Sequence, residues 1–340
     1  MSRDLAIDLG SANILVLARG KGIVLSQPTI IAMNERTGEV LAMGEDALRV
    51  AGNGDSEPVV TFQPLRRGAV SDFALTERLL HLVLRRIGAG RVVKPRALVS
   101  IPSSVTVVER RAVEEATLQA GARHVFLIEK PIAAAIGAGL PIDEPPGNCV
   151  VDVGGGTTEV AVISMGGMVS SRMMPIGGFD FDQAIQRYLR DEHGMAVGER
   201  TAEALKRAIG SAAPLEEEQK AEVSGREIET GAPKTVIVSS EEIRSALGGT
   251  TRVVVEAVRG ALADTPPELA HDVLDRGIYL CGGGALLKGF DRRLTTETGI
   301  PILPAENPLE TVCRGAGEAL EELDRLRTRG LVYAPDATFR

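Results

Sequence analysis

The sequence predicts an α/β fold built from two related halves. Short apolar segments such as "RALVSIP" and "HVFLIE" alternate with amphipathic segments such as "TERLLHLVLRRI", and this interleaving of strands and helices is typical of α/β proteins. A motif in which an aspartate leads into a glycine turn occurs once in each half. The length of 340 residues accommodates two domains, and no apolar run approaches the roughly 20 residues that span a bilayer.

The first half opens with a predicted β-hairpin. Residues 5–17 form its first arm and fold back at the glycine turn 20–22 onto residues 23–25. Further short strands and turns follow over about residues 30–65. This segment is expected to form a small β-rich insertion in the first α/β core.

Helices and strands interleave through the rest of this half. Residues 76–87 carry apolar side chains at helical spacing, and Gly88 follows as a stop signal. After the buried strand "RALVSIP", a helix is expected over residues 103–120, with a polar residue at its start and Gly121 at its end. "HVFLIE" is the next strand, and "PIAAAIGAGL" begins a helix of small residues with Pro131 in its first turn.

The second half repeats this organisation with a longer insertion, at about residues 181–245. "NCVVDVGGGTTEVAVIS" predicts a strand, a turn and a strand, and residues 201–209 predict a helix. "AEVSGREIE" and "KTVIVSS" predict a hairpin, after which Ser239 and Glu242 form a capping box for a long helix. "GIYLCGGGALLKG" is a strand that runs into a glycine turn and a helix. The polar residues 323–340 are expected to be frayed.

Composition argues against several classes of protein. The net charge of −8 and the aromatic content of 3%, with no Trp, disfavour a nucleic-acid partner. Cys149, Cys281 and Cys313 lie far apart without a CxxC pair, which predicts buried, reduced thiols rather than a disulfide or metal site. The start "MSRDLAIDLG" lacks a signal-peptide pattern. These features favour a cytoplasmic protein.

The two aspartate-led turns match each other in register. "AIDLGSANILV" and "VVDVGGGTTEV" are offset by 144 residues (152 − 8), and a repeated unit indicates a duplicated core. Glycine lets backbone N–H groups approach a ligand, and such groups form an anion-binding concavity. Taken singly, each turn is also typical of an ordinary hairpin. The matching residues are Asp8, Gly10, Ser11 and Asn13 in the first turn, and Asp152, Gly154, Gly155 and Thr157 in the second.

Two such turns at one site predict a bound metal–polyphosphate. Asp8 and Asp152 would repel each other there, and Mg²⁺ removes the conflict, because it bridges to carboxylates through water and binds phosphate oxygens. A third glycine turn, Gly282–Gly284, follows a strand and is a candidate for the nucleoside end. The sequence has no GxxxxGK[ST] motif and no GxGxxG that opens a βαβ unit. A P-loop NTPase and a dinucleotide enzyme are therefore disfavoured.

With these motifs in place, the chain resembles the MreB/Mbl family of bacterial actins, within the actin/Hsp70/hexokinase superfamily. The resemblance runs from about residue 4 to 322 and is carried by "IDLGSANILV", "AGARHVFLIEKPIAAAIGAGLP", "VVDVGGGTTEVAVIS", "GERTAEALKRAIG" and "GIYLCGGGALLKGFDRRL". It implies an actin-like fold, with two duplicated RNase H-like lobes around a nucleotide cleft. Lobe I would comprise residues 1–140, closed by about 313–330, and lobe II residues 141–312.

The resemblance also implies a role for each matching residue. On the residues alone, Glu203 and Lys206 share a helix face and form a routine surface salt bridge, whereas the family places this pair at the nucleoside. It implies catalytic roles for Glu129, Asp152 and Thr158. The implied phosphate loops are Asp8, Gly10, Ser11, Ala12 and Asn13, and Asp152, Gly154, Gly155, Gly156, Thr157 and Thr158. The implied adenosine loop is Gly282, Gly283 and Gly284.

The family's function follows as a further expectation. The resemblance implies a protein that binds ATP with Mg²⁺, polymerises into double protofilaments at the inner face of the cytoplasmic membrane, and serves cell-wall elongation or sporulation. A small-molecule kinase of the same superfamily remains an alternative, although no acid or sugar-contacting cluster for its substrate is recognisable. A chaperone-type ATPase is the other alternative, and it requires a substrate domain after the nucleotide core.

The segment "LIEKPIAAAI" departs from the family, in which it reads "IEEP" and the second acid orients the attacking water. Lys130 occupies that position, and an ammonium donates hydrogen bonds but accepts none. Three outcomes are open. Lys130 contacts the γ-phosphate and hydrolysis is slow, Glu129 or another side chain substitutes for the missing acid, or Lys130 points to solvent.

Membrane contact is expected at a short loop. The first strand begins by residue 5, so an N-terminal amphipathic helix is not expected. In "GAGRVVKPR", Val92 and Val93 are flanked by cationic residues, and such a loop places apolar tips in the bilayer interface while cations meet anionic headgroups. A packed loop remains the alternative.

Overall fold

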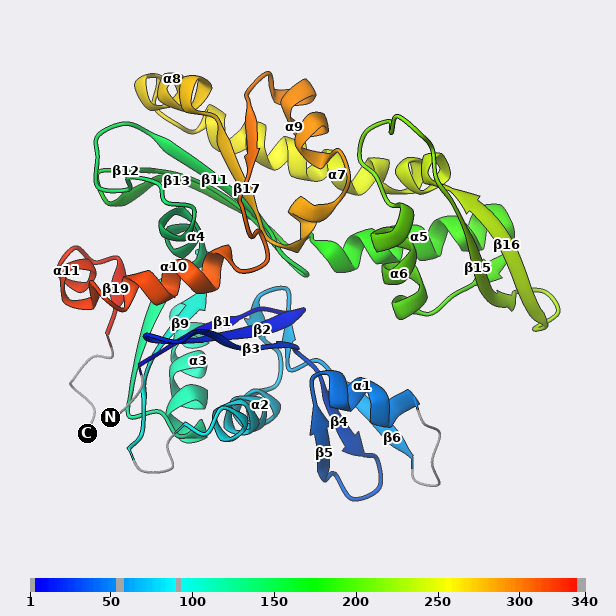
Figure 1. Ribbon diagram of the computed structural model, residues 1–340, viewed down its shortest axis with the longest axis horizontal. Helices are drawn as coiled ribbons and strands as arrows, with labels where there is room; N and C mark the ends of the chain where they lie inside the picture. Colours follow the sequence, from blue (N-terminus) through cyan, green and yellow to red (C-terminus); the bar gives the residue numbers. More distant parts are fainter. Residues whose placement is uncertain (1–3, 53–57, 90–92, 335–340) are drawn as a thin grey trace. The chain divides into compact units, whose positions relative to one another are not determined.

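The computed structural model describes residues 4–52, 58–89 and 93–334 of the chain. Its residues divide into two compact units (Figure 1). Unit 1 comprises Met1–Pro145, Ile163–Met168 and Leu309–Arg340, and unit 2 comprises Pro146–Val162 and Val169–Pro308. Segments from near both ends of the chain therefore belong to unit 1.

Unit 1 is built on a six-stranded sheet in the order β19-β10-β9-β1-β2-β3. β1 pairs parallel with β9, and β9 pairs parallel with β10. β2, β3 and β19 join antiparallel to their neighbours. The strands are β1 (Leu5–Leu9), β2 (Asn13–Ala18), β3 (Gly22–Pro28), β9 (Arg96–Ile101), β10 (His124–Glu129) and β19 (Val332–Tyr333).

Helices cover both faces of this sheet. In Figure 1, α2 and α3 lie on one side of it, and α4 and α10 lie on the other. A small sheet in the order β5-β4-β6 and the helix α1 form the predicted β-rich insertion, and β7 pairs with β8. The helices are α1 (Glu45–Gly52), α2 (Phe73–Arg86), α3 (Val107–Ala120), α4 (Lys130–Gly137), α10 (Thr311–Ala319) and α11 (Leu323–Thr328). The short strands are β4 (Ile31–Asn34), β5 (Val40–Met43), β6 (Val59–Phe62), β7 (Leu65–Arg66) and β8 (Ala69–Val70).

Helices α4 and α10 touch through their backbones. A Cβ added at Gly315 would lie 1.8 Å from the carbonyl oxygen of Ala133, and one added at Gly137 would lie 2.0 Å from that of Thr311. Real Cβ atoms do not come this close to other atoms, so a side chain at either position would push the helices apart. The two glycines therefore hold α4, which begins directly after β10, against α10.

Unit 2 is built on a five-stranded sheet in the order β13-β12-β11-β17-β18, in which β11, β17 and β18 are parallel. A three-stranded sheet, β14-β15-β16, forms part of its insertion. Its strands are β11 (Asn148–Val153), β12 (Thr158–Ser164), β13 (Gly167–Met174), β14 (Met195–Ala196), β15 (Lys220–Glu227), β16 (Pro233–Ser239), β17 (Ile278–Cys281) and β18 (Ile302–Pro304). Its helices are α5 (Gly178–His193), α6 (Glu199–Ile209), α7 (Ser240–Ala263), α8 (Pro267–Arg276), α9 (Phe290–Thr298) and the 3-10 helix η1 (Gly283–Leu286).

The two large sheets share one strand order. It reads β3-β2-β1-β9-β10 in unit 1 and β13-β12-β11-β17-β18 in unit 2. In both, the strand that ends in the aspartate-led turn lies between its hairpin partner and a parallel strand. The predicted α/β class and the duplicated core are therefore confirmed.

Several local predictions are also confirmed. The Ser239 side chain accepts from the Glu242 N–H and the Glu242 carboxylate accepts from the Ser239 N–H, which is the capping box predicted for α7. All three cysteines are buried thiols. Burial raises the pKa of Cys149 and of Cys313 to about 12. Among the described residues, no helix is long and apolar enough to cross a membrane.

Three local predictions were wrong in part. The opening arm, residues 5–17, is two strands, β1 and β2, because the turn at Gly10 interrupts it. Helix α3 begins at Val107 rather than at residue 103, because Thr106 and Glu109 form a capping box there. Residues 323–333 are not frayed, since they form α11 and β19, and β19 pairs with β10.

Candidate functional site

The first aspartate-led turn connects β1 to β2 and is fixed by backbone hydrogen bonds. The Gly10 N–H donates to the Asn13 carbonyl at 3.1 Å, and a Cβ at Gly10 would lie 2.6 Å from that oxygen. Thr29 holds the turn from the other side, because its N–H donates to the Ala12 carbonyl at 2.8 Å and its hydroxyl donates to the Gly10 carbonyl at 2.7 Å. Glycine is thus required at position 10 by the tightness of the turn.

The second turn, between β11 and β12, has the same hydrogen bond. The Gly154 N–H donates to the Thr157 carbonyl at 2.8 Å, at positions offset by the same 144 residues from the first (154 − 10 and 157 − 13). Here the start of α5 holds the turn, since the Gly178 N–H donates to the Gly154 carbonyl at 2.9 Å. The sequence match therefore corresponds to a repeated backbone geometry.

Asp8 at the first turn is buried, and its carboxylate is already partnered. The Ser100 hydroxyl donates to its Oδ1 at 2.6 Å, and the Lys130 ammonium lies 3.1 Å from the same oxygen. Asp8 is 8% exposed and Lys130 is 7% exposed. The hypothesis that Lys130 points to solvent is therefore wrong, because the side chain turns inward onto the strand that precedes the first turn.

Glu129, the residue before Lys130, belongs to a different cluster. The Tyr333 hydroxyl on β19 donates to its Oε1 at 2.7 Å, and a guanidinium nitrogen of Arg110 on α3 lies 3.6 Å from the same oxygen. The Arg110 guanidinium also stacks over the Tyr333 ring, 4.3 Å from its centroid. Burial, followed by the bond to Glu129, raises the pKa of Tyr333. Sequence reasoning missed Arg110 and Tyr333.

In unit 2, the third glycine turn lies against the second aspartate. Asp152 is paired in register with Cys281 at the ends of β11 and β17. A Cβ at Gly282, where φ is +79°, would lie 2.3 Å from Oδ1 of Asp152, and one at Gly284 would lie 2.2 Å from Cγ1 of Val153. Gly282 and Gly284 are therefore needed to bring this turn against Asp152 and Val153. The structure brings these predicted residues of unit 2 together.

Two hydroxyl groups predicted as ligand contacts have protein partners. The Ser11 Oγ accepts from the Gly68 N–H at 2.8 Å. The Thr158 hydroxyl, fully buried, donates to the Ile176 carbonyl at 2.8 Å. The hydroxyl proton of Thr158 is thus engaged by the backbone, whereas its oxygen retains acceptor capacity.

Lys206 is paired with Asp182 and not with Glu203. Its ammonium lies 2.8 Å from Oδ1 of Asp182 and donates to the Gly178 carbonyl at 3.1 Å, while Glu203 is exposed. Burial raises the pKa of Asp182 to about 6, against the opposing effect of Lys206. The predicted surface salt bridge is therefore wrong, and Asp182 is a third residue that sequence reasoning missed.

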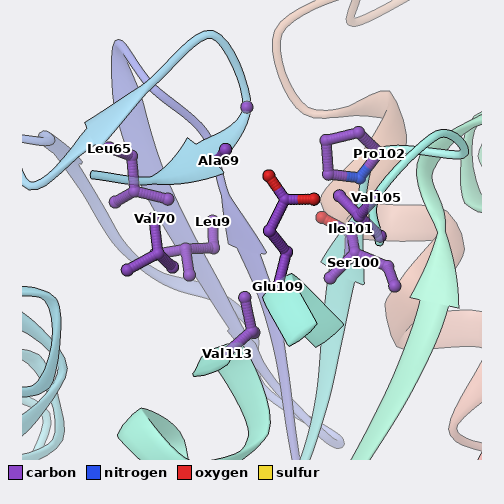
Figure 2. A pocket seen from close by; sticks show the side chains of 11 residues that line it. Leu9, Leu65, Ala69, Val70, Ser100, Ile101, Pro102, Val105, Glu109 and Val113 are labelled. Atoms are coloured by element: carbon purple, nitrogen blue, oxygen red, sulfur yellow. The ribbon is translucent and has the colours of Figure 1, made fainter. Parts of the chain in front are cut away.

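The described residues contain no group of three or more potential metal-ligating side chains. Mg²⁺ in nucleotide sites keeps several waters and is bound mainly by phosphate oxygens plus one or two carboxylates. A cavity of about 10 Å³ lies beside the first turn, where Glu109 points between the Leu65–Val70 segment and the Pro102–Val105 segment (Figure 2). That volume holds at most one water molecule.

The proposed membrane loop is described only in part. Val92 lies outside the described residues, and Val93 is 43% exposed.

Comparison with solved structures gives the fold class. The chain matches MreB5 of Spiroplasma citri bound to ADP with a TM-score of 0.89 at 34% identity, covering 97% of this chain and 99% of the other. The same protein bound to AMPPNP gives a TM-score of 0.91 at the same identity and coverage. A MamK double helical filament, at 19% identity over 94% and 99% of the two chains, gives 0.81 and shows the fold alone. Together with the repeated sheets and turns, these likenesses define an actin-like protein.

The particular family follows from the sequence matches. Residues 2–328 match the family described as MreB/Mbl protein. The cell shape-determining protein Mbl of Bacillus cereus is 44% identical over 97% of this chain and 99% of its own length. The cell shape-determining protein MreB of Escherichia coli is 47% identical, over 95% and 94%. The chain belongs to the MreB/Mbl family.

Proposed function

We propose that this chain is an ATP-binding, actin-like cytoskeletal protein that polymerises into membrane-associated filaments. In this role it contributes to cell shape and to the spatial organisation of peptidoglycan synthesis. The observation that carries the nucleotide part is the repeated turn, with its bond from Gly10 to Asn13 in unit 1 and from Gly154 to Thr157 in unit 2. The names of the curated relatives and the ADP and AMPPNP in the Spiroplasma structures support it.

The proposed site residues act through backbone and charge. The two turns present N–H groups to a polyphosphate, and the glycine run Gly282–Gly284 receives the adenosine. Lys206, oriented by Asp182, contacts the nucleoside together with Glu203. Asp8 and Asp152 are the residues that would hold Mg²⁺ through water, and the ion would supply neutralisation of phosphate charge.

ATP hydrolysis by this chain is proposed to be slow. Orienting the attacking water requires a hydrogen-bond acceptor, and the ammonium of Lys130 has none. Substitution by Glu129 is disfavoured, because its carboxylate already accepts from Tyr333 and lies beside Arg110. Two contacts therefore support slow turnover. Lys130 is paired with Asp8, and Glu129 accepts a hydrogen bond from Tyr333.

The proposed partners follow from the family. The chain associates with itself in double protofilaments, lies in the cytoplasm at the inner face of the cell membrane, and serves elongation or sporulation machinery. The loop containing Val92 and Val93 provides weak membrane binding per subunit, which repetition along a filament multiplies. A nucleic-acid role stays disfavoured by the net charge of −8.

The test is concentration-dependent sedimentation of the full chain with and without Mg-ATP, paired with electron microscopy on a lipid monolayer. Gly10→Ala is the informative variant, because its Cβ would lie 2.6 Å from the Asn13 carbonyl. Gly248→Ala is the matched control, since a Cβ there meets nothing within 4 Å. We expect ATP-dependent filaments for the wild type and the control, and their loss in Gly10→Ala. The proposal would be refuted if the same amount of protein sediments with and without nucleotide, or if calorimetry detects no binding of adenine nucleotide.

A further inference from the structure

The phosphate end of unit 1 contains a buried cation that belongs to the protein itself. The Lys130 ammonium lies 3.1 Å from Oδ1 of Asp8, and both side chains are almost entirely buried. The Ser100 hydroxyl donates to the same oxygen at 2.6 Å. Asp8 directly precedes the Leu9–Gly10 step into the first turn. The positive charge therefore lies at the end of β1, which leads into the turn whose N–H groups are proposed to bind phosphate.

This placement changes the electrostatics of the turn. With an acid at position 130, two buried carboxylates would face the incoming polyphosphate, and a divalent cation would be needed to offset their repulsion. With Lys130, the charge of Asp8 is already balanced by its ion-pair partner. Charges interact strongly at short range in a partly desolvated site, so the paired ammonium removes most of the repulsion that Asp8 would exert on phosphate. This effect depends on the position of the charge and requires no additional hydrogen bond from the ammonium.

We propose that Lys130 is a resident cation that takes over part of the neutralisation otherwise supplied by Mg²⁺. As a result, this chain binds adenine nucleotide with only a weak requirement for a divalent metal. The inference rests on the proposed nucleotide-binding function and deepens it, because it assigns metal-free nucleoside di- and triphosphates as ligands of the same site. It concerns binding and is independent of the hydrolysis rate.

The geometry that holds Lys130 supports the assignment. Lys130 is the first residue of α4, and Gly137 and Gly315 hold that helix against α10 through backbone contacts. Its neighbour Glu129 is tied to Tyr333. These contacts fix the backbone on both sides of Lys130, and Asp8 holds its ammonium, so the charge is in position before any ligand arrives.

Calorimetric titration of the full chain with ADP and AMPPNP, each in Mg²⁺ and in EDTA, tests the proposal. The variants are Lys130→Glu, which reverses the charge, Lys130→Met, which removes it, and Lys130→Arg, which keeps it. Lys21→Glu, in the exposed turn before β3, controls for a change in overall charge. Circular dichroism confirms that each variant is folded, and Lys130→Met serves if Lys130→Glu is not.

The expected result is that EDTA weakens binding by about tenfold or less in the wild type, Lys130→Arg and Lys21→Glu. It should weaken binding by about a hundredfold or more in Lys130→Met and Lys130→Glu. Two results would overturn the role of Lys130 as a resident cation and leave the proposed function intact. In one, the wild type binds in Mg²⁺ but not in EDTA. In the other, EDTA weakens binding equally in the wild type and in Lys130→Met. Absence of binding even in Mg²⁺ would instead overturn the proposed function together with it.

Discussion

The Lys130 ammonium lies 3.1 Å from Oδ1 of Asp8 in the interior of unit 1. The Lys130 side chain is therefore buried rather than solvent-exposed. It is fixed on the residue that leads into the first glycine turn. Both proposals about nucleotide chemistry depend on this contact, and they are separable because one concerns turnover and the other concerns binding.

The first prediction concerns phosphate release from Mg-ATP. Lys130→Gln and Lys130→Glu both supply an oxygen that accepts a hydrogen bond from water, so each should raise turnover by about tenfold or more. Lys130→Met supplies no acceptor and should leave the rate at the wild-type level. Single-turnover phosphate release under saturating nucleotide measures this. Equal rates in Gln and Met would show that the missing acceptor does not limit hydrolysis.

The second prediction is a pH dependence at Asp182. Burial raises its pKa from the ordinary value of 3.8 to about 6, so the folded chain holds this proton more tightly than the unfolded chain does. The stabilisation is fully present below about pH 4 and is lost as the pH rises through about 6. This titration should lower the unfolding free energy of the wild type by about 2–3 kcal/mol as the pH rises from about 4 to above 6. Asp182→Asn lacks the titration, so its unfolding free energy should not show this part of the decrease.

Urea denaturation across this pH range, with circular dichroism as the readout, checks the Asp182 effect. The exposed Asp275→Asn is the control and should keep the wild-type pH profile, since its carboxylate is solvated. Coincident profiles for Asp182→Asn and the wild type would mean that Asp182 is ionised normally beside Lys206.

The third prediction concerns the contact between α4 and α10. Gly315→Ala places a Cβ 1.8 Å from the Ala133 carbonyl, and relieving such a clash by moving backbone costs about 1–3 kcal/mol. Gly248→Ala, in the interior of α7 with open space around its Cβ, should instead stabilise by about 0.5–1 kcal/mol. Chemical denaturation midpoints report both. Equal shifts of the same sign would contradict the packing argument.

The fourth prediction concerns the membrane loop. The double variant Val92→Asp/Val93→Asp should reduce co-sedimentation with anionic liposomes, because charged tips do not enter the bilayer interface. Val169→Asp is the matched control, since Val169 is 40% exposed and Val93 is 43% exposed. Unchanged lipid binding in the double variant would remove this loop from the account of membrane attachment.

The parts of the site that the sequence predicted are those encoded locally. A strand, an aspartate and a glycine turn follow one another within a few residues, and their repetition at a fixed offset indicates two copies. The capping box of Ser239 and Glu242 was predictable for the same reason, because it spans one helical turn. Turn geometry of this kind depends on which residues have a small or absent side chain.

The partners of the charged residues were not predictable. Tyr333 reaches Glu129 across 204 positions of the chain, and Asp182 meets Lys206 from a different helix. Such contacts depend on how the helices and strands pack, which a single sequence does not specify. Lys206 illustrates this. Helical spacing predicted Glu203 as its partner, whereas the structure pairs it with the buried Asp182.

The return of the chain to unit 1 has a consequence for synthesis on the ribosome. Helix α10 packs on α4 and on β1, and β19 completes the edge of the six-stranded sheet. All residues of unit 2 up to Pro308 emerge before these last segments do. Unit 2 can therefore acquire its core while unit 1 still lacks α10, α11 and β19. The six-stranded sheet of unit 1 can be completed only after Tyr333 has left the exit tunnel.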